Sequence, residues 1–183
     1  MKANVWIPGV VTNVLMNKIS VGAPTLLGAD IDGEAAADNS GYSVSLSSDG
    51  SRVAIGAHQN DGNGGDSGHV RIYSWNGSAW TKLGSDIDGE AANDGSGYSV
   101  SLSSDGSRVA IGAYSNDGTN GANSGHVRIY DYDGSAWVQV GGDIDGEAAG
   151  DWSGWSVSSS SNGDVVAIAG IGNDGNGQDA GHV

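Results

Sequence analysis

Most of the chain consists of three near-copies of one stretch of sequence. Each copy contains D-I-D-G-E-A-A, then S-G-(Tyr/Trp)-S-V-S, a turn, a V-A-I segment, N-D-G and G-H-V. The first Asp of each copy is Asp30, Asp86 and Asp143, which lie 56 and 57 residues apart. Self-similarity at a fixed period marks an array of identical supersecondary units. A residue that recurs in every copy therefore more often serves the structure of the repeat than a unique active site.

Residues 41–97 span one copy, and their pattern predicts four strands. Tyr42, Val44 and Leu46 alternate with serines, which is the period of a half-buried strand. Three further strands are predicted at 52–57, 69–73 and 79–83, and we name the four strands A to D. Tight turns join A to B and C to D, whereas longer Gly/Asn/Asp-rich loops join B to C and D to the next A, at 85–96. Helix signals are nearly absent. Only the E-A-A segments could form a helical turn, and they are too short to persist alone.

Four strands repeated at this spacing predict an all-β protein built from propeller-type blades of antiparallel strands, about three blades per chain. A β-trefoil, which also has three copies of four strands, is the alternative, and the alternation of tight turns with long loops favours the propeller. Residues 22–183 hold the repeats, at about 30–85, 86–142 and 143–183, the last one incomplete. Residues 1–21 form an N-terminal extension, in which apolar runs on both sides of Pro8-Gly9 predict an extra hairpin.

The motif order from residue 28 to 183 resembles the FG-GAP repeat class. The residues that carry the resemblance are G-Y-S-V-S-L-S-S-D-G-S-R-V-A-I-G-A, then N-D-G-N-G-G-D-S-G-H-V-R-I-Y, then G-S-A-W. The class occurs in the seven-bladed propeller of integrin α subunits and in bacterial surface proteins. The resemblance implies a propeller, an extracellular or cell-surface location and a role in adhesion. Serine replaces the Phe of the F-G pair (Ser40, Ser96 and Ser153), and His58 or Tyr114 replaces the Pro of G-A-P.

The A–B connection departs further from that class. Integrin-type repeats hold a nine-residue D-x-D-x-D-G-x-x-D calcium loop there, whereas this chain has S-S-D-G-S at Asp49 and Asp105 and S-S-N-G-D in the third copy. Calcium takes six to eight oxygen ligands, which one carboxylate in a tight turn does not supply. We therefore do not transfer the calcium site of the class to this turn.

The chain is strongly acidic, with a formal net charge of −15. Such a field repels nucleic-acid phosphates and anionic membranes and attracts cations or basic partners. The sequence has no apolar run of the length that a membrane-spanning helix needs, so neither nucleic-acid binding nor membrane insertion is expected. There are no cysteines, which excludes disulfides and thiolate metal sites.

Of the 22 acidic residues, 17 fall in the D–A and B–C loops, which should emerge at one end of every blade. The first interpretation is a hard-cation site, with calcium as the candidate cofactor. The second is that Asp side chains cap their own loop backbones. The candidate metal ligands are Asp30, Asp32, Glu34, Asp38, Asp86, Asp88, Glu90, Asp94, Asp143, Asp145, Glu147 and Asp151; the candidate ligand-binding residues of the B–C loops are Asp61, Asp117 and Asp174.

Signals for catalysis are weak. His69, His126 and His182 recur at the start of strand C, which predicts a structural role, and no G-x-S-x-G nucleophile motif is present. We therefore expect no catalytic residue and no enzyme. Trp152 and Trp155 break the pattern of the earlier copies and predict either a sugar-binding pocket or simple packing.

The strand order predicts an incomplete ring. From residue 22 the order is D, A-B-C-D, A-B-C-D, A-B and the start of C, and about three blades do not close a propeller. Open sheet edges invite pairing with another chain. We therefore expect a homodimer that closes one seven-bladed ring, or else a piece of a longer surface protein. The expected function is a non-enzymatic binding or adhesion module for a protein or glycan ligand; the alternatives are a purely structural repeat segment and a lectin-like propeller.

Overall fold

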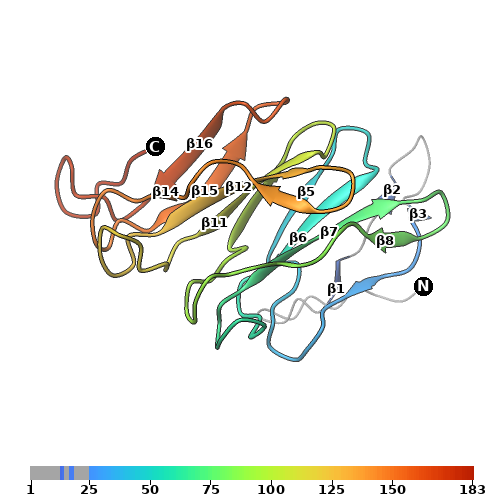
Figure 1. The fold of residues 1–183 in the computed structure, drawn as a ribbon, viewed down its shortest axis with the longest axis horizontal. Helices are drawn as coiled ribbons and strands as arrows, with labels where there is room; N and C mark the ends of the chain where they lie inside the picture. Colours follow the sequence, from blue (N-terminus) through green and yellow to red (C-terminus); the bar gives the residue numbers. More distant parts are fainter. Residues whose placement is uncertain (1–12, 15–16, 19–24) are drawn as a thin grey trace.

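The computed structural model of the chain describes residues 13–14, 17–18 and 25–183. These residues form β-strands, turns and loops (Figure 1), and none of them belongs to a helix of the length and apolarity that a membrane crossing requires. The all-β prediction is confirmed.

Two complete blades occupy the middle of the chain. Blade 1 contains β5 (Ser43–Leu46), β6 (Arg52–Ala57), β7 (His69–Trp75), β8 (Trp80–Lys82) and β9 (Ile87–Asp88). Blade 2 contains β10 (Ser99–Leu102), β11 (Arg108–Ala113), β12 (His126–Tyr132), β13 (Trp137–Gln139) and β14 (Ile144–Asp145). In both blades the first four strands are antiparallel neighbours in chain order. This is the predicted order of strands A to D, and it is the order of a propeller blade.

The D–A connection is shorter than the sequence predicts. The segment expected to be a loop from residue 85 begins with β9, which pairs with the start of β7 through His69↔Asp88 and Val70↔Ile87. The same pairing joins β14 to β12. Strand D is therefore interrupted and then resumes, so that the I-D of each D-I-D-G-E motif lies on a sheet edge.

A half-blade lies on either side of the two blades. The leading half-blade contains β1 (Asn13–Val14), β2 (Asn17–Lys18), β3 (Thr25–Leu26) and β4 (Ile31–Asp32), in which β1 pairs with β4 and β2 with β3. Its register Asn13↔Asp32 lies 56 residues before His69↔Asp88. These strands therefore occupy the positions of C and D in a preceding blade. The repeat thus extends further towards the N-terminus than the motifs indicate, and the extra hairpin predicted around Pro8-Gly9 lies outside the described residues.

The trailing half-blade contains the A and B strands of the third copy. They are β15 (Ser153–Ser159) and β16 (Val166–Gly170), which pair with each other. A bridge from His182 to Gly170 begins the third strand, as the sequence predicts.

Strand A of each blade packs against strand A of the next, since β10 contacts both β5 and β15. The backbone amide of Leu102 donates to Ser45 Oγ at 2.9 Å, and that of Ser159 donates to Ser101 Oγ at 2.9 Å. The small serines of the S-V-S pattern thus link the blades at their inner strands. The main apolar core lies between blades 1 and 2 and includes Ala54 and Ile72 from the first and Val109 from the second.

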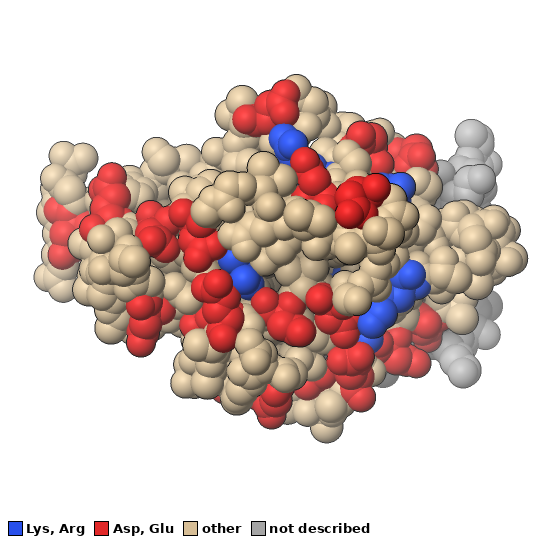
Figure 2. Space-filling model, viewed as in Figure 1, with Lys and Arg blue, Asp and Glu red and all other residues tan. Residues whose placement is uncertain are grey.

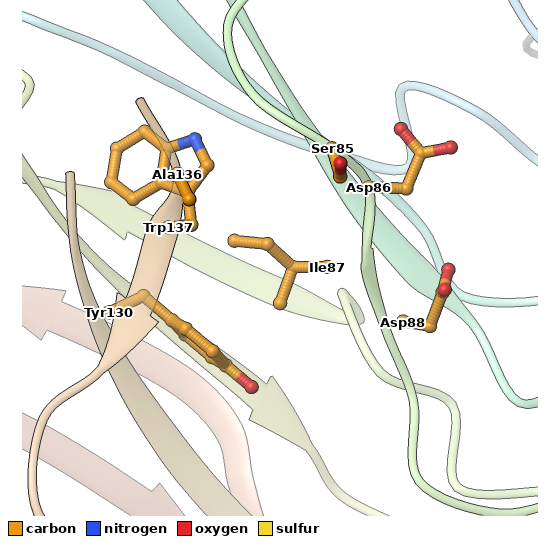
Figure 3. A pocket seen from close by; sticks show the side chains of 7 residues that line it. All are labelled: Ser85, Asp86, Ile87, Asp88, Tyr130, Ala136 and Trp137. Atoms are coloured by element: carbon orange, nitrogen blue, oxygen red, sulfur yellow. The ribbon is translucent and has the colours of Figure 1, made fainter. Parts of the chain in front are cut away.

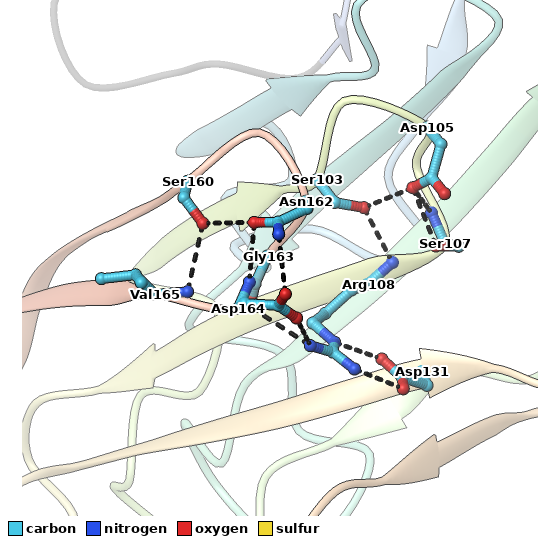
Figure 4. Close-up of polar contacts among 10 residues, drawn as sticks. All are labelled: Ser103, Asp105, Ser107, Arg108, Asp131, Ser160, Asn162, Gly163, Asp164 and Val165. Atoms are coloured by element: carbon cyan, nitrogen blue, oxygen red, sulfur yellow. Dashed lines mark hydrogen bonds and ion pairs between the residues drawn. The ribbon is translucent and has the colours of Figure 1, made fainter.

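The A–B turns also connect neighbouring blades. Asp105 accepts hydrogen bonds from Ser103 Oγ at 2.7 Å and from the Ser107 amide at 2.9 Å (Figure 4). From the next strand, the Arg108 guanidinium binds Asp131 in its own blade and reaches Asp164 in the following turn, at 3.0 Å. The single Asp of S-S-D-G-S therefore stabilises a turn, in agreement with the absence of a calcium loop at this position.

Candidate functional site

The buried Asp of each D–A connection organises the E-A-A turn. Asp38, Asp94 and Asp151 accept hydrogen bonds from the amides of Ala35, Ala91 and Ala148 at 2.9–3.1 Å. The Nδ2 of Asn60 donates to Asp38 and that of Asn173 to Asp151, which ties the turn to the B–C loop. Three of the twelve candidate metal ligands therefore already stabilise the backbone.

The first Asp of each B–C loop closes that loop. Asp61, Asp117 and Asp174 accept the amide hydrogens of Asp66, Asn123 and Asp179 at 2.7–2.9 Å. The three donor residues have φ of 51° to 52°, a conformation that Asn and Asp tolerate better than other side chains. The Asx-type role considered for these loops is present in all three copies.

The D–A and B–C loops meet at one end of the blades. The Nδ2 of Asn63 donates to the carbonyls of Gly89 and Glu90, and that of Asn120 donates to the carbonyl of Gly146. Acidic side chains dominate the charged surface seen in Figure 2, with few lysines and arginines among them. The described basic residues of blades 1 and 2 lie on strands: Arg52, Arg71, Lys82, Arg108 and Arg128.

Glu34 forms part of a cluster with buried basic residues of strand C. Its carboxylate lies 3.2 Å from Arg71 Nη1 and 3.9 Å from His69 Nδ1. Glu90 repeats the arrangement with Arg128 at 3.6 Å and His126 at 3.9 Å. The Glu of D-I-D-G-E thus joins one blade connection to the H-V-R strand that follows it. The sequence analysis assigned no such role to either arginine, although H-V-R recurs in two copies.

These clusters also contain Asp86 and Asp143, and their Glu, His and Asp ligand atoms lie within 4.8 Å of one another. Such a group could hold a metal ion. Burial lowers the pKa of His69 and of His126, and the positive charge of the adjacent arginine lowers it further, which favours the neutral imidazole that ligates metals. The guanidinium of Arg71 or Arg128, however, pairs with the same glutamate and would compete with an ion for it.

A more suitable cavity lies beside blade 2. Its volume is about 320 Å³, and its lining includes five carboxylates: Glu90, Asp94, Asp117, Asp143 and Asp145. At its wall Gly118 has no side chain, and a Cβ there would lie 3.1 Å from Asp145 Oδ1, 3.1 Å from Ser124 Oγ and 3.3 Å from Asn116 Oδ1. Ser124 Oγ is buried and has no hydrogen-bond partner. Oxygens of the D–A connection and of the B–C loop therefore lie close together beside Gly118.

Two other cavities lie at equivalent positions of successive copies, where aromatic side chains pack between blades. One of about 220 Å³ is lined by Asp86, Ile87, Asp88, Tyr130 and Trp137, together with Ser85 and Ala136. Figure 3 shows Ile87 pointing between the two aromatic rings while both carboxylates point away from them. The counterpart, of about 240 Å³, is lined by Ala29–Asp32, Tyr73, Ala79 and Trp80. Trp137 Nε1 donates to the Leu83 carbonyl at 2.8 Å, so this ring connects blade 2 to blade 1.

The aromatic residues at the start of strand A form a continuous stack. The ring of Tyr98 lies 4.8 Å from Tyr42 and 4.8 Å from Trp155, and Tyr114 packs against both Tyr98 and Trp155. Trp152 lies 6.0 Å from Trp155. The rings of Trp155 and its neighbours pack against one another, while Tyr42 and Trp152 at the two ends of the stack remain 49% and 36% exposed. The recurrent S-G-(Tyr/Trp)-S motif was the available signal for this stack.

Comparison with protein families matches residues 86–130 to the FG-GAP repeat. The second copy is an FG-GAP repeat. It begins at the Asp of D-I-D-G-E and ends in β12, so it includes the Gly118 cavity wall and the His126–Glu90 pair. The other two copies have the same motifs and the same loop hydrogen bonds as this FG-GAP repeat. A search of curated proteins finds no significant match to the chain.

Proposed function

We propose that the chain is a non-enzymatic binding and adhesion module, which binds a divalent cation, calcium in the first instance, in the acidic cavity of blade 2. The bound cation would complete the acidic loop face for a protein or glycan ligand. The observation that supports this most directly is the cavity itself, whose lining brings together the carboxylates of Glu90, Asp94, Asp117, Asp143 and Asp145. Calcium prefers such hard oxygen ligands.

The cavity has the chemistry that this cation needs. Asp143 and Asp145 come from the edge of strand D, and Asp117 and Asn116 come from the B–C loop, so the two loop classes contribute together. Thr119 Oγ1 donates to Asp145 Oδ2 at 2.9 Å, which leaves Oδ1 directed at the Gly118 space.

The site chemistry is less suited to catalysis. His69 and His126 are buried, and each lies within 4 Å of a glutamate. Each candidate group also recurs at the same position in another copy, so no single acid–base pair stands out. A site built from a few carboxylates corresponds to an affinity of about 0.1–1 mM, which is typical of extracellular calcium modules. We therefore also propose an extracellular or cell-surface location.

Calcium titration tests the proposal. Binding at ten times the dissociation constant should stabilise the fold by about 1.4 kcal/mol, which corresponds to a rise in melting temperature of roughly 3–6 °C. Asp145→Asn should weaken calcium binding by about tenfold, since ligand charge sets the affinity. Gly118→Ala should also weaken it, because the methyl group would fill the space between the three oxygens. Isothermal titration calorimetry would give the affinities.

Two control variants match these changes. Asp66→Asn removes the same charge from a B–C loop of blade 1 and should leave the affinity nearly unchanged. Gly142→Ala adds a methyl group where nothing lies within 4 Å. A wild-type chain that shows no calcium-dependent heat and no shift of the melting temperature would contradict the proposal, as would equal loss in Asp145→Asn and Asp66→Asn.

A further inference from the structure

The third strand of blade 2 begins with a buried histidine that faces two carboxylates from other segments. His126 is 1% exposed, and its Nδ1 lies 3.9 Å from Glu90 Oε2 and 4.0 Å from Asp143 Oδ2. Glu90 belongs to the connection before blade 2, and Asp143 lies in the gap between β13 and β14. No described residue forms a hydrogen bond with this imidazole. The buried ring is therefore a ligand group without a partner, directed at two carboxylate oxygens.

Neighbouring side chains hold the other oxygen of each carboxylate. Arg128 Nη1 approaches Glu90 at Oε1, at 3.6 Å, and Gln139 Nε2 donates to Asp143 Oδ1 at 2.7 Å. The oxygens that face His126 are Oε2 of the glutamate and Oδ2 of the aspartate. Arg128 and a metal ion can therefore use different atoms of the same glutamate. Outer groups of this kind orient the ligands in protein metal sites.

The donor set fits zinc. Zinc accepts an imidazole nitrogen and carboxylate oxygens, with water in an open fourth position, whereas calcium takes oxygen ligands. Tetrahedral ligands about 2.0–2.2 Å from zinc lie about 3.4 Å apart, so each carboxylate would have to move towards His126 by about 0.6 Å. The side chains of Glu90 and Asp143 are 45% and 30% exposed. This exposure leaves room for the movement and gives the ion access from solvent.

The corresponding cluster of blade 1 consists of Glu34, His69 and Asp86. It differs from the cluster of blade 2 because Lys82 stands in the place of Gln139 and binds Asp86 Oδ1 at 2.7 Å. The cluster of blade 1 thus has an arginine and a lysine for its two carboxylates, whereas that of blade 2 has an arginine alone. An added cation should bind more tightly in blade 2, because one positive charge fewer repels it there.

We propose that Glu90, His126 and Asp143 bind a zinc ion, which fixes the connection before blade 2 to the third and fourth strands of that blade. The proposal does not rest on calcium binding. Glu90 and Asp143 also line the acidic cavity, but the zinc site adds the imidazole, which lies outside the lining of that cavity, and does not require Asp145.

Isothermal titration of the untagged chain with zinc chloride, in calcium-free buffer at pH 7.5, tests the site. The wild-type chain should bind one zinc ion tightly. His126→Gln should lose this binding, and Glu90→Gln, which changes an exposed side chain, should weaken it by about tenfold or more. The matched controls in blade 1, His69→Gln and Glu34→Gln, should keep the tight site. Circular dichroism of each variant shows whether it remains folded.

An exchange at the position that differs between the blades tests the same idea in the opposite direction. Lys82→Gln should give the chain a second zinc site, because it removes the competing charge from the cluster of blade 1. Gln139→Lys should weaken the site of blade 2 by about tenfold, the usual effect of changing an outer partner of a metal ligand. Both side chains lie on outer strands, so neither change disturbs the core.

A wild-type chain that gives no zinc-dependent heat would overturn the proposal. Equal loss of zinc binding in His126→Gln and His69→Gln would also overturn it, since the ion would then bind elsewhere. The calcium proposal fails separately: Asp145→Asn should keep the zinc site, and His126→Gln should keep the calcium-dependent rise in melting temperature.

Discussion

At the scale of the residue, many of the described aspartates accept hydrogen bonds from backbone amides a few residues away. The carboxylate of Asp49 accepts hydrogen bonds from the Ser51 amide and from Ser47 Oγ, and these lower its pKa to about 2. Asp105 repeats this arrangement, and its pKa is likewise lowered to about 2. A high count of aspartates in this chain therefore reflects tight turns first. Asp145 differs from these turn residues in that it lines the acidic cavity beside blade 2.

The buried histidines predict a stability that falls in mild acid. Burial lowers the pKa of His69 and His126 in the folded protein below the unfolded value of about 6.5. Between the two values the unfolded chain binds more protons, so the free energy of unfolding is fully present above pH 6.5 and decreases below it. The slope reaches at most about 1.4 kcal/mol per pH unit for each histidine.

Urea unfolding at pH 7.5, 6.5 and 5.5 measures this slope. His69→Gln combined with His126→Gln should reduce it, leaving the part due to His58, whose pKa burial also lowers. An unchanged slope in the double variant would show that other groups bind the protons.

At the scale of the element, the blades approach each other most closely where glycines face one another. A Cβ on Gly56 of β6 would lie 2.0 Å from the Gly97 carbonyl oxygen and 2.3 Å from Ser43 Oγ. Gly112 and Gly154 repeat this contact between blade 2 and the trailing half-blade. The V-A-I-G-A motif therefore keeps its Gly because two strands from different blades meet there.

Gly56→Ala should accordingly separate blades 1 and 2. We expect a loss of about 1–3 kcal/mol in the free energy of unfolding, the usual cost of overpacking a dense contact. Gly65→Ala is the control, because nothing lies within 4 Å of a Cβ at that loop position. Chemical unfolding of both variants measures the difference, and equal stabilities would contradict the close approach of the two blades.

Local pattern predicts the strands well and the contacts between copies poorly. Strand 52–57 was predicted with its observed bounds, since its apolar run lies between two turn signals. The two-residue β9 was missed because its I-D dipeptide has no periodicity and is held by pairing with His69 and Val70. Asp143 and Asp145 were named as candidate ligands from their motif. Ser124, Asn116 and Gly118 were not, because their oxygens and the space between them meet only after two loops fold together.

At the scale of the whole molecule, the net charge of −15 is concentrated on loops, while Arg71 and Arg128 are buried. Like charges on a compact surface repel one another and reduce stability. Salt weakens this repulsion, since the screening length falls from about 30 Å at 0.01 M to about 8 Å at 0.15 M ionic strength.

Raising sodium chloride from 10 to 150 mM at pH 7.5 should therefore raise the melting temperature by a few degrees, measured by differential scanning fluorimetry in the presence of chelator. Millimolar calcium at matched ionic strength should add a further rise in the wild-type chain and a smaller one in Asp145→Asn, because screening is common to both proteins and coordination is not. If sodium chloride lowered the melting temperature instead, attractive pairs such as Arg108 with Asp131 and Asp164 would outweigh the repulsion between the loops. Repulsion within the acidic face would then reduce the stability of the fold only slightly. The charge density of this face would have to be explained by ligand binding alone.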